Sequence, residues 1–398
     1  MLRSRFSTPT SVGDRLRQGC GTTTMMVGGR QSLGVAAAPG PSSSMQQRTE
    51  RALPPLVYSP EYSLSGWDPK HRFVMDKFRR LHETLAREPV FGRTDSFASP
   101  EDPAVESGAA KRLPCGQGYD FTGSAVQTID QNWLGLVHDL EYVKGFCEGT
   151  VPMRRIGLPW SQPLVRRTRL EVAGTILTAR LALEHGLACN LAGGTHHAHY
   201  AEGSGFTIFN DLVVAARVLL DEFNTTCMAS SSTATSSRKV NRVMIVDLDV
   251  HQGDGTAALT QNDDRIFSLS FHCESNFPLR KVPSDLDVPF PDGCGDYEYL
   301  NRLQQVLPPL LDQWRPDLVL YDAGVDVHVE DRLGRLNITT SGMRRRDEFV
   351  MEQCLDRCIP VATVIGGGYH ADHAHLASRH AVIIRTAVAT WQNYRPKR

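Results

Sequence analysis

Four short segments rich in glycine, aspartate and histidine each follow an apolar run that is typical of a buried strand. The segments begin at Gly193, Asp247, Asp322 and Gly366. In open α/β sheets, ligands bind just beyond the carboxyl ends of the strands. Neighbouring parallel strands would deliver all four segments to one edge, whereas scattered surface loops would not follow apolar runs. The sequence therefore predicts a parallel sheet with a site at its carboxyl edge.

The alternation of strand-like and helix-like segments supports the same fold. We expect strands over residues 242–248, 266–271, 317–321 and 361–365. Helical periodicity follows over residues 297–313, 343–358 and 373–391. Near-continuous apolar strands joined by helices are typical of a sheet covered on both faces. The predicted fold class is α/β, a single domain with an open, mostly parallel β-sheet flanked by helices on both faces.

The first half of the chain shows the same two kinds of segment. A first strand and turn are expected within residues 50–66, and a short apolar run spans 188–191. Apolar residues at helical spacing predict helices over 75–85, 164–183 and 209–223. Polar stretches predict loops over 91–118 and 273–296.

Composition divides the chain into one domain and two additions. We expect the domain to span residues 51–398, with residues 224–240, which are mostly Ser and Thr, as a low-complexity insertion. Residues 1–50 are expected to be a disordered extension. Arginine and hydroxyl residues abound in it and acids are scarce, which is typical of an organelle transit peptide, mitochondrial or plastid. The alternative is a disordered tail without a targeting signal, on a protein of the cytosol or nucleus.

The bulk composition is that of a soluble globular protein, with 41% hydrophobic and 22% charged residues. The formal net charge of −1 gives no reason to expect direct nucleic-acid binding. No apolar run reaches the ~18 residues that a membrane span requires. The 9 cysteines are scattered and indicate a reducing compartment rather than a disulfide framework. Nothing in the sequence selects an oligomeric state.

The sequence Asp247-Leu248-Asp249-Val250-His251 closes the most apolar run of the chain. In an extended strand, alternate side chains point to one side, so the two carboxylates and the imidazole would converge. Such groups repel or desolvate one another unless a cation or a proton shares the site. We select Asp249, His251 and Asp326 as the three ligands of a Zn²⁺ ion, with Fe²⁺ as the alternative.

Two further segments carry groups suited to catalysis. His196 and His197 follow two glycines and suit general acid/base work, with Asp247 and Asp254 as the carboxylates that fix their tautomers. A metal-ligand pair or a structural cluster is the alternative. Tyr369 ends a glycine run and could donate a hydrogen bond to an oxyanion. The alternatives are a phosphate-binding loop or an ordinary buried tyrosine.

Several motifs, in this order along the chain, resemble the histone deacetylase superfamily over residues 55–398. They are Gly-Gly-Thr-His-His-Ala from 193, Asp-Leu-Asp-Val-His-Gln-Gly-Asp-Gly-Thr from 247, Ala-Gly-Val-Asp from 323 and Gly-Gly-Gly-Tyr from 366. Residues 71–78 and 276–287 are similar to class IV deacetylases and their bacterial relatives. The residue that binds the substrate backbone at the rim in class I relatives has no clear match.

The resemblance implies a set of roles, residue by residue. It implies a divalent metal on Asp249, His251 and Asp326, with His196, His197, Asp247, Asp254 and Tyr369 as catalytic residues. Gly205, Phe206 and Gly367 are expected to bind substrate. A structural K⁺ or Na⁺ is expected to be held by Asp247, Asp249, His251 and Ser270. The implied fold agrees with the alternation of strands and helices.

The resulting hypothesis is zinc-dependent hydrolysis of an acetyl-lysine or longer acyl-lysine amide in a protein. Its runner-up is a small-molecule amidohydrolase acting on acetylated polyamines or related amines. A catalytically inactive scaffold that binds acyl-lysine is disfavoured by the intact ligand set and Tyr369. The two-manganese chemistry of ureohydrolases would require further carboxylates in place of His251 and Gly253.

Overall fold

The computed structural model describes residues 53–91, 97–98, 133–226 and 239–394. The chain divides into two compact units, Met1–Thr49 and Glu50–Arg398, and all described residues belong to the second. The predicted extension of residues 1–50 lies outside the described residues. So does most of the predicted insertion of residues 224–240.

The described residues form one sheet of eight strands, with every neighbouring pair parallel. The strand order is β2-β1-β3-β8-β7-β4-β5-β6. The bounds are β1 Leu56–Val57, β2 Phe97–Ala98, β3 Leu187–Asn190, β4 Val243–Asp247, β5 Ile266–Cys273, β6 Leu286–Phe290, β7 Leu318–Asp322 and β8 Val361–Val364.

Four adjacent strands in this order carry the segments that sequence analysis singled out. They are β3, β8, β7 and β4, and a glycine-, aspartate- or histidine-rich segment follows each of them. Because all four strands run in the same direction, their carboxyl ends meet at one edge. The predicted α/β fold and its common edge are confirmed.

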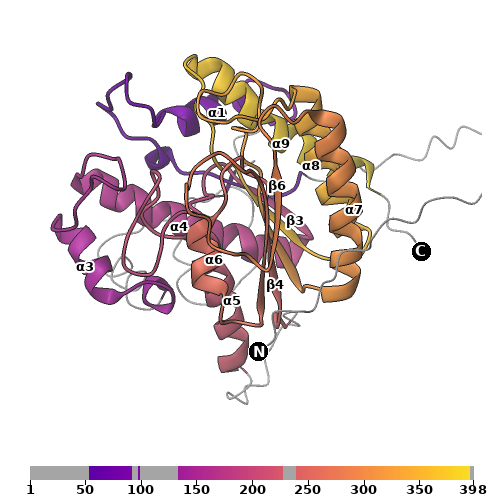
Figure 1. Ribbon diagram of the computed structural model, residues 1–398, viewed down its shortest axis with the longest axis horizontal. Helices are drawn as coiled ribbons and strands as arrows, with labels where there is room; N and C mark the ends of the chain where they lie inside the picture. The colour runs from indigo at the N-terminus through magenta and orange to yellow at the C-terminus, as the bar shows by residue number, and fades with distance from the viewer. Residues whose placement is uncertain (1–52, 92–96, 99–132, 227–238, 395–398) are drawn as a thin grey trace, which may run out of the picture. The chain divides into compact units, whose positions relative to one another are not determined.

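Helices cover both faces of the sheet (Figure 1). One layer holds α4, α5 and α6, and the other holds α7, α8 and α9, with α1 packed against α9. Their bounds, with those of the shorter helix α3, are α1 Lys77–Ala86, α3 Leu140–Glu148, α4 Gln162–His185, α5 Asp211–Thr226, α6 Asp254–Thr260, α7 Asp296–Trp314, α8 Thr340–Leu355 and α9 His373–Asn393.

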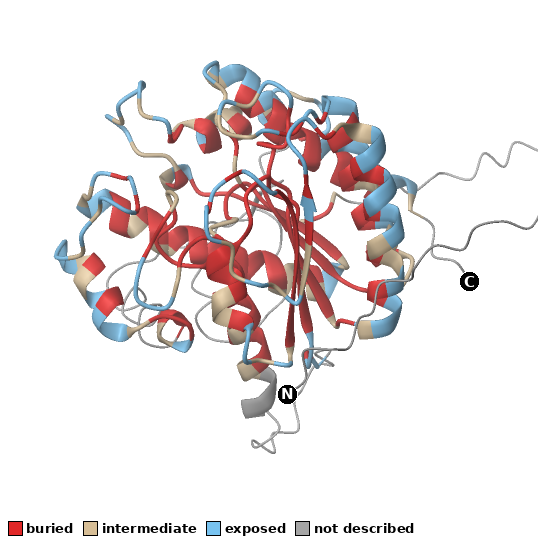
Figure 2. Cartoon of the chain, viewed as in Figure 1, coloured by how far each residue is buried: buried red, intermediate tan, exposed pale blue. Residues whose placement is uncertain are grey.

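The central strands are buried along their whole length, as expected for a sheet enclosed by two helical layers. Figure 2 shows buried residues throughout the inner strands of the sheet and exposed ones on the outward side of α7. The long helix α4 begins at the capping residue Ser161 and ends at Gly186, whose positive φ suits a helix end. Among the described residues, no helix is long and apolar enough to span a membrane.

Two predicted loops each contain a strand. β6 lies within residues 273–296 and β2 within residues 91–118. β6 is an edge strand of alternating burial that contains Pro289, so its sequence lacks the continuous apolar run of the inner strands. β2 has only two residues, which leaves no pattern to detect. In addition, α5 continues to Thr226 and takes in the first residues of the predicted insertion.

A buried arginine on α8 holds together the loops that leave β4 and β7. Arg346 has none of its surface exposed. Its guanidinium donates to the carbonyl oxygens of Leu248, Ala323 and Gly324 at 3.1, 3.2 and 2.8 Å. It also donates to Asp347 at 2.8 Å. One cation therefore satisfies carbonyl groups that would otherwise be buried without partners.

Replacing Arg346 with methionine is expected to lower the free energy of unfolding by about 3–5 kcal/mol, because the carboxylate of Asp347 would remain buried without its partner. Arg344→Met, on the same helix, removes an exposed pair with Glu348 and is expected to cost less than about 0.5 kcal/mol. Urea unfolding followed by circular dichroism measures both values. Similar losses in the two variants would contradict the assignment.

Candidate metal centre and active site

The chain leaves β4 at Asp247 and turns through residues 248–251. The turn is held by its own carboxylates, because Asp247 accepts from the backbone N–H of Asp249 at 3.2 Å and Asp249 accepts from that of His251 at 2.8 Å. Since the strand ends at Asp247, the alternation predicted for residues 247–251 does not continue. Asp247 lies in a group with His196 and Asp322, and Asp249 and His251 lie in a neighbouring group.

Asp249, His251 and Asp326 form a buried group whose ligand atoms all lie within 4.8 Å of one another. His251 Nδ1 is 3.0 Å from Asp249 Oδ1 and 3.1 Å from Asp326 Oδ2. The remaining carboxylate oxygens accept backbone N–H groups, from Gly367 to Asp249 at 2.8 Å and from Val250 to Asp326 at 3.0 Å. Two carboxylates and an imidazole at this spacing fit three ligands of one divalent cation.

Gly367, a predicted substrate-binding residue, contributes its backbone to this group. A Cβ atom at this position would lie 2.1 Å from Asp326 Oδ2 and 2.5 Å from Asp249 Oδ2. The close approach of the chain to both carboxylates therefore requires glycine.

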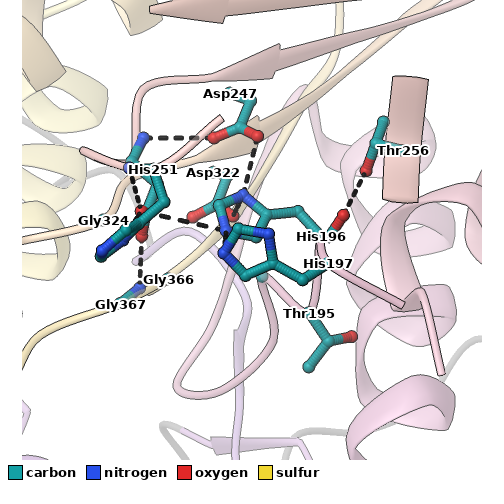
Figure 3. Close-up of polar contacts among 12 residues, drawn as sticks. Thr195, His196, His197, Asp247, His251, Thr256, Asp322, Gly324, Gly366 and Gly367 are labelled. Carbon is teal, nitrogen blue, oxygen red and sulfur yellow. Dashed lines mark hydrogen bonds and ion pairs between the residues drawn. The ribbon is translucent and has the colours of Figure 1, made fainter. Parts of the chain in front are cut away.

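The two adjacent histidines lie against each other beside the metal group (Figure 3). His196 Nδ1 contacts Asp247 Oδ2 at 2.8 Å, and His197 Nδ1 contacts Asp254 Oδ1 at 2.7 Å. Their Nε2 atoms are 3.1 Å apart. Asp254 begins α6, which brings its carboxylate beneath the imidazole. The structure thus brings together both predicted imidazole–carboxylate pairs.

The two imidazoles have opposite electrostatic settings. Burial and the neighbouring His196 lower the pKa of His197 to about 3, which keeps its ring neutral. Burial also disfavours a charge on His196, but Asp247 and Asp249 raise its pKa well above the usual value. The neutral imidazole of His197 offers a ring nitrogen as a hydrogen-bond and proton acceptor, whereas the protonated ring of His196 contributes positive charge.

Tyr369 lies beside the metal group and lines the same cavity as Asp249. Its ring centre is 6.2 Å from that of His251 and 5.8 Å from that of Phe206. Burial and the nearby Asp326 raise the pKa of the phenol well above its usual value, so it remains a hydrogen-bond donor. The backbone N–H of Tyr369 donates to Asp331 Oδ2 at 2.7 Å, which fixes the end of the glycine run.

Two phenylalanines form walls beside His197. The Phe277 ring packs edge-on against the His197 ring, with centres 4.8 Å apart. Gly205 approaches the same imidazole, and Phe206 after it has a positive φ of 67°. The predicted substrate residues Gly205 and Phe206 therefore lie at the site. Phe277 lies in the segment 276–287 that is similar to class IV deacetylases, but no role at the site was predicted for it.

A cavity extends from the metal group toward α1 and α4. Its lining includes Asp249, His197 and Tyr369, together with Lys77 of α1 and Glu171 of α4. Lys77 is buried and donates to the carbonyl oxygen of Gly366 at 3.0 Å. Burial lowers its pKa to about 8. Sequence analysis missed Lys77 because a lysine at the start of a helix has the pattern of a surface residue.

Asp322, at the end of β7, is a second residue to which the sequence assigned no role. It is fully buried, and within the described part of the chain neither of its oxygens has a hydrogen-bond partner. Burial and the charge of Asp247 raise its pKa well above the usual value. Its position in the Asp-Ala-Gly-Val-Asp segment could have indicated a role for it at the site, but only the last carboxylate of that segment, Asp326, was predicted to be a metal ligand.

Ser270, the fourth predicted ligand of a monovalent cation, lies next to Asp247 in the sheet. The two residues are register partners on β5 and β4. The Ser270 hydroxyl is 3.0 Å from His272 Nδ1. The structure therefore brings Ser270 to the back of the site, beside the residues predicted to share its ion.

Comparison with known proteins gives a consistent result. A histone deacetylase domain matches residues 109–384. An uncharacterized protein of Picosynechococcus sp. is 45% identical over 336 residues, which cover 84% of this chain and 98% of the relative. Histone deacetylase 2 of Arabidopsis thaliana is 33% identical over 326 residues, which cover 81% and 76%. Histone deacetylase 10, chloroplastic, of Oryza sativa subsp. japonica is 31% identical over 270 residues, 60% of this chain and 57% of the relative.

A solved structure supports the fold. The crystal structure of the HD domain of HDA15 superposes with a TM-score of 0.59 at 20% sequence identity, covering 85% of this chain and 89% of that one. The domain match and the Arabidopsis relative both span most of the chain. The chain therefore belongs to the histone deacetylase family and is a hydrolase of the deacetylase type.

Proposed function

We propose that this protein hydrolyses acetyl-lysine or longer acyl-lysine amides with the help of a divalent metal ion, Zn²⁺ in preference to Fe²⁺. The observation that carries the proposal is the buried Asp249–His251–Asp326 group, with Tyr369 and two carboxylate-paired histidines next to it. The motifs at 71–78 and 276–287 lead us to place the chain with class IV deacetylases.

The electrostatics of the metal group fit a cation. Burial disfavours a charge on His251, but its hydrogen bonds to Asp249 and Asp326 and their negative charges raise its pKa to about 10. Two carboxylates thus stabilise positive charge at the point where their oxygens meet the imidazole. When bound there, Zn²⁺ supplies a Lewis acid for the acyl carbonyl oxygen and for the attacking water.

We assign each proton transfer of the reaction to a residue near the metal group. His197 is neutral and accepts the proton of the attacking water. Asp254 holds the other ring nitrogen of His197, which fixes its tautomer. An imidazole, which we assign to the same residue, then donates a proton to the leaving lysine amine. His196, kept positive by Asp247, stabilises the negative charge that develops beside it.

Tyr369 acts on the acyl oxygen. Its phenol remains protonated and donates a hydrogen bond as negative charge develops on that oxygen. Phe206 and Phe277 enclose the alkyl chain of the lysine and exclude water from the scissile amide. We propose that a structural K⁺ or Na⁺ would be held by Asp247, Asp249, His251 and Ser270.

Zinc-loaded wild-type protein is expected to release acetate or a fatty acid from acetyl-lysine or fatty-acyl-lysine peptides, which leaves a free lysine in the peptide. Tyr369→Phe is expected to lower kcat about 100-fold or more because the oxyanion loses a donor. Mass spectrometry of a peptide panel, with acetylated polyamines included, measures both rates. Zinc content by elemental analysis is expected to stay the same, since the phenol is not a ligand.

Tyr297→Phe is the matched control, because Tyr297 has 85% of its surface exposed on α7. It is expected to retain wild-type rates on every substrate. Full activity of Tyr369→Phe, or a peptide panel that remains uncleaved by the wild type, would show that the proposed function is wrong.

The metal affinity is expected to rise with pH. In the metal-free protein the pKa of His251 is about 10, so the ring carries a proton that a metal ion must displace. Releasing that proton makes the association constant for Zn²⁺ increase about 10-fold per pH unit below the pKa of His251. The increase is expected to be steeper below about pH 7, because burial and Asp249 raise the pKa of Asp326 to about 7 and its proton must be displaced as well. Competition with a chromophoric chelator between about pH 6 and pH 9 measures the slope. An affinity independent of pH would contradict the ligand assignment.

We infer that residues 1–50 direct the protein to an organelle. Their arginine-rich, acid-poor composition and the chloroplastic name of the rice relative support this proposal. A fluorescent protein fused to residues 1–50 is expected to enter plastids or mitochondria, with residues 51–100 fused in the same way as the control. A fusion that stays in the cytosol would contradict the proposal.

A further inference from the structure

Three exposed arginines stand on the segments that enclose the mouth of the site, and they are called the rim arginines below: Arg72, Arg280 and Arg332. The guanidinium carbon of Arg72 lies 5.9 Å from the centre of the Phe206 ring. The neighbouring rings of His71 and Phe73 also pack on Phe206, at 6.0 and 5.7 Å. Arg72 therefore places a positive charge at the wall of the substrate channel.

Arg280 belongs to a loop that begins at the channel residue Phe277. The ammonium group of Lys281 donates to the carbonyl oxygens of Asn276 and Pro278, both at 2.6 Å, and so closes the loop on itself. Leu279 has 91% of its surface exposed on this closed loop, and Arg280 is exposed beside it. The loop thus presents an apolar side chain and a cation next to the channel.

The two neighbours of Arg332 in the sequence, Asp331 and Leu333, each contact a segment of the site. On one side, Asp331 accepts the backbone N–H of Tyr369 at 2.7 Å. On the other side, the carbonyl oxygen of Leu333 accepts from the Asn276 side chain at 2.6 Å. The exposed Arg332 therefore lies between the tyrosine segment and the Phe277 loop.

The charge of the rim arginines is not neutralised locally. Within the described ranges of the chain, none of the three forms an ion pair. On the Arg332 loop, Asp331 accepts the backbone N–H groups of Leu333, Gly334 and Tyr369, and Glu330 pairs with Arg379, so neither carboxylate forms an ion pair with Arg332. The formal net charge of the whole chain is −1, so the positive mouth is a local feature.

We propose that the mouth selects acylated lysines flanked by acidic residues and disfavours acylated amines that carry additional positive charge. The inference rests on the proposed hydrolysis of N-acyl amines and names the substrate class. An acidic side chain next to the acylated lysine meets unpaired arginines, whereas a cationic acetylated polyamine is repelled by them. An exposed pair is worth up to about fivefold in affinity, so about threefold for each of two flanking acids gives about 10-fold in kcat/KM.

Three acetyl-lysine peptides that differ only in their two flanking residues, Glu, Gln or Lys, test the inference with the full-length, zinc-loaded protein. A monoacetylated diamine is the fourth substrate. The Glu peptide is expected to exceed the Lys peptide about 10-fold in kcat/KM, chiefly through KM, and to exceed the diamine by more. The ratio is expected to shrink as salt rises from about 50 to about 500 mM, since exposed charges are screened.

The triple variant Arg72→Gln, Arg280→Gln, Arg332→Gln is expected to bring the Glu-to-Lys ratio to within about twofold of one. Arg302→Gln, an exposed position on α7, is the matched control and is expected to keep the wild-type ratio. Equal cleavage of the charged peptides by the wild type, or a ratio that persists in the triple variant, overturns the inference.

The neutral Gln peptide separates this failure from failure of the proposed function. Cleavage of that peptide without any effect of flanking charge leaves the hydrolase proposal standing and removes the charge selection. If no substrate of the set is cleaved, the hydrolase proposal fails and the inference fails with it.

Discussion

Burial of several carboxylates at one sheet edge is the constraint on which the rest of the structure depends. Asp247, Asp249, Asp322 and Asp326 lie together, all nearly or fully excluded from solvent. Removing such charges from water costs several kcal/mol each unless positive charge or hydrogen bonds compensate. The fold supplies imidazoles, backbone N–H groups from the turns and a cavity suited to a cation. Parallel strands are required because only they bring four strand ends to the same place.

The fold was predictable wherever one interaction dominated the local sequence. The inner strands are buried on both faces, so continuous apolar runs identified β4, β7 and β8 within a residue or two of their ends. At the sheet edges no uniform apolar pattern is required, since an edge strand has a neighbouring strand on one side only. β6 and the two-residue β2 were missed for that reason.

The candidate site was predictable in its residues and less so in its arrangement. Carboxylates and imidazoles at strand ends indicated chemistry, and the structure brings Asp249, His251 and Asp326 together. The sequence did not show that the alternation of side chains stops after Asp247, because a carboxylate that accepts the backbone N–H group two residues further on can replace ladder pairing. Long-range partners were also hidden. The burial of Lys77 depends on Gly366, a residue 289 positions away.

The backbone contact between Gly367 and Asp249 has a consequence for how this site can diverge. Side chains at the mouth lie in solvent, so substitutions there alter recognition while the metal group stays intact. Gly367 in the glycine run cannot be substituted in this way, since a single methyl group there would occupy the space of two carboxylate oxygens. Variation in substrate preference is therefore free to accumulate around an interior that tolerates almost none, which separates the evolution of specificity from that of chemistry.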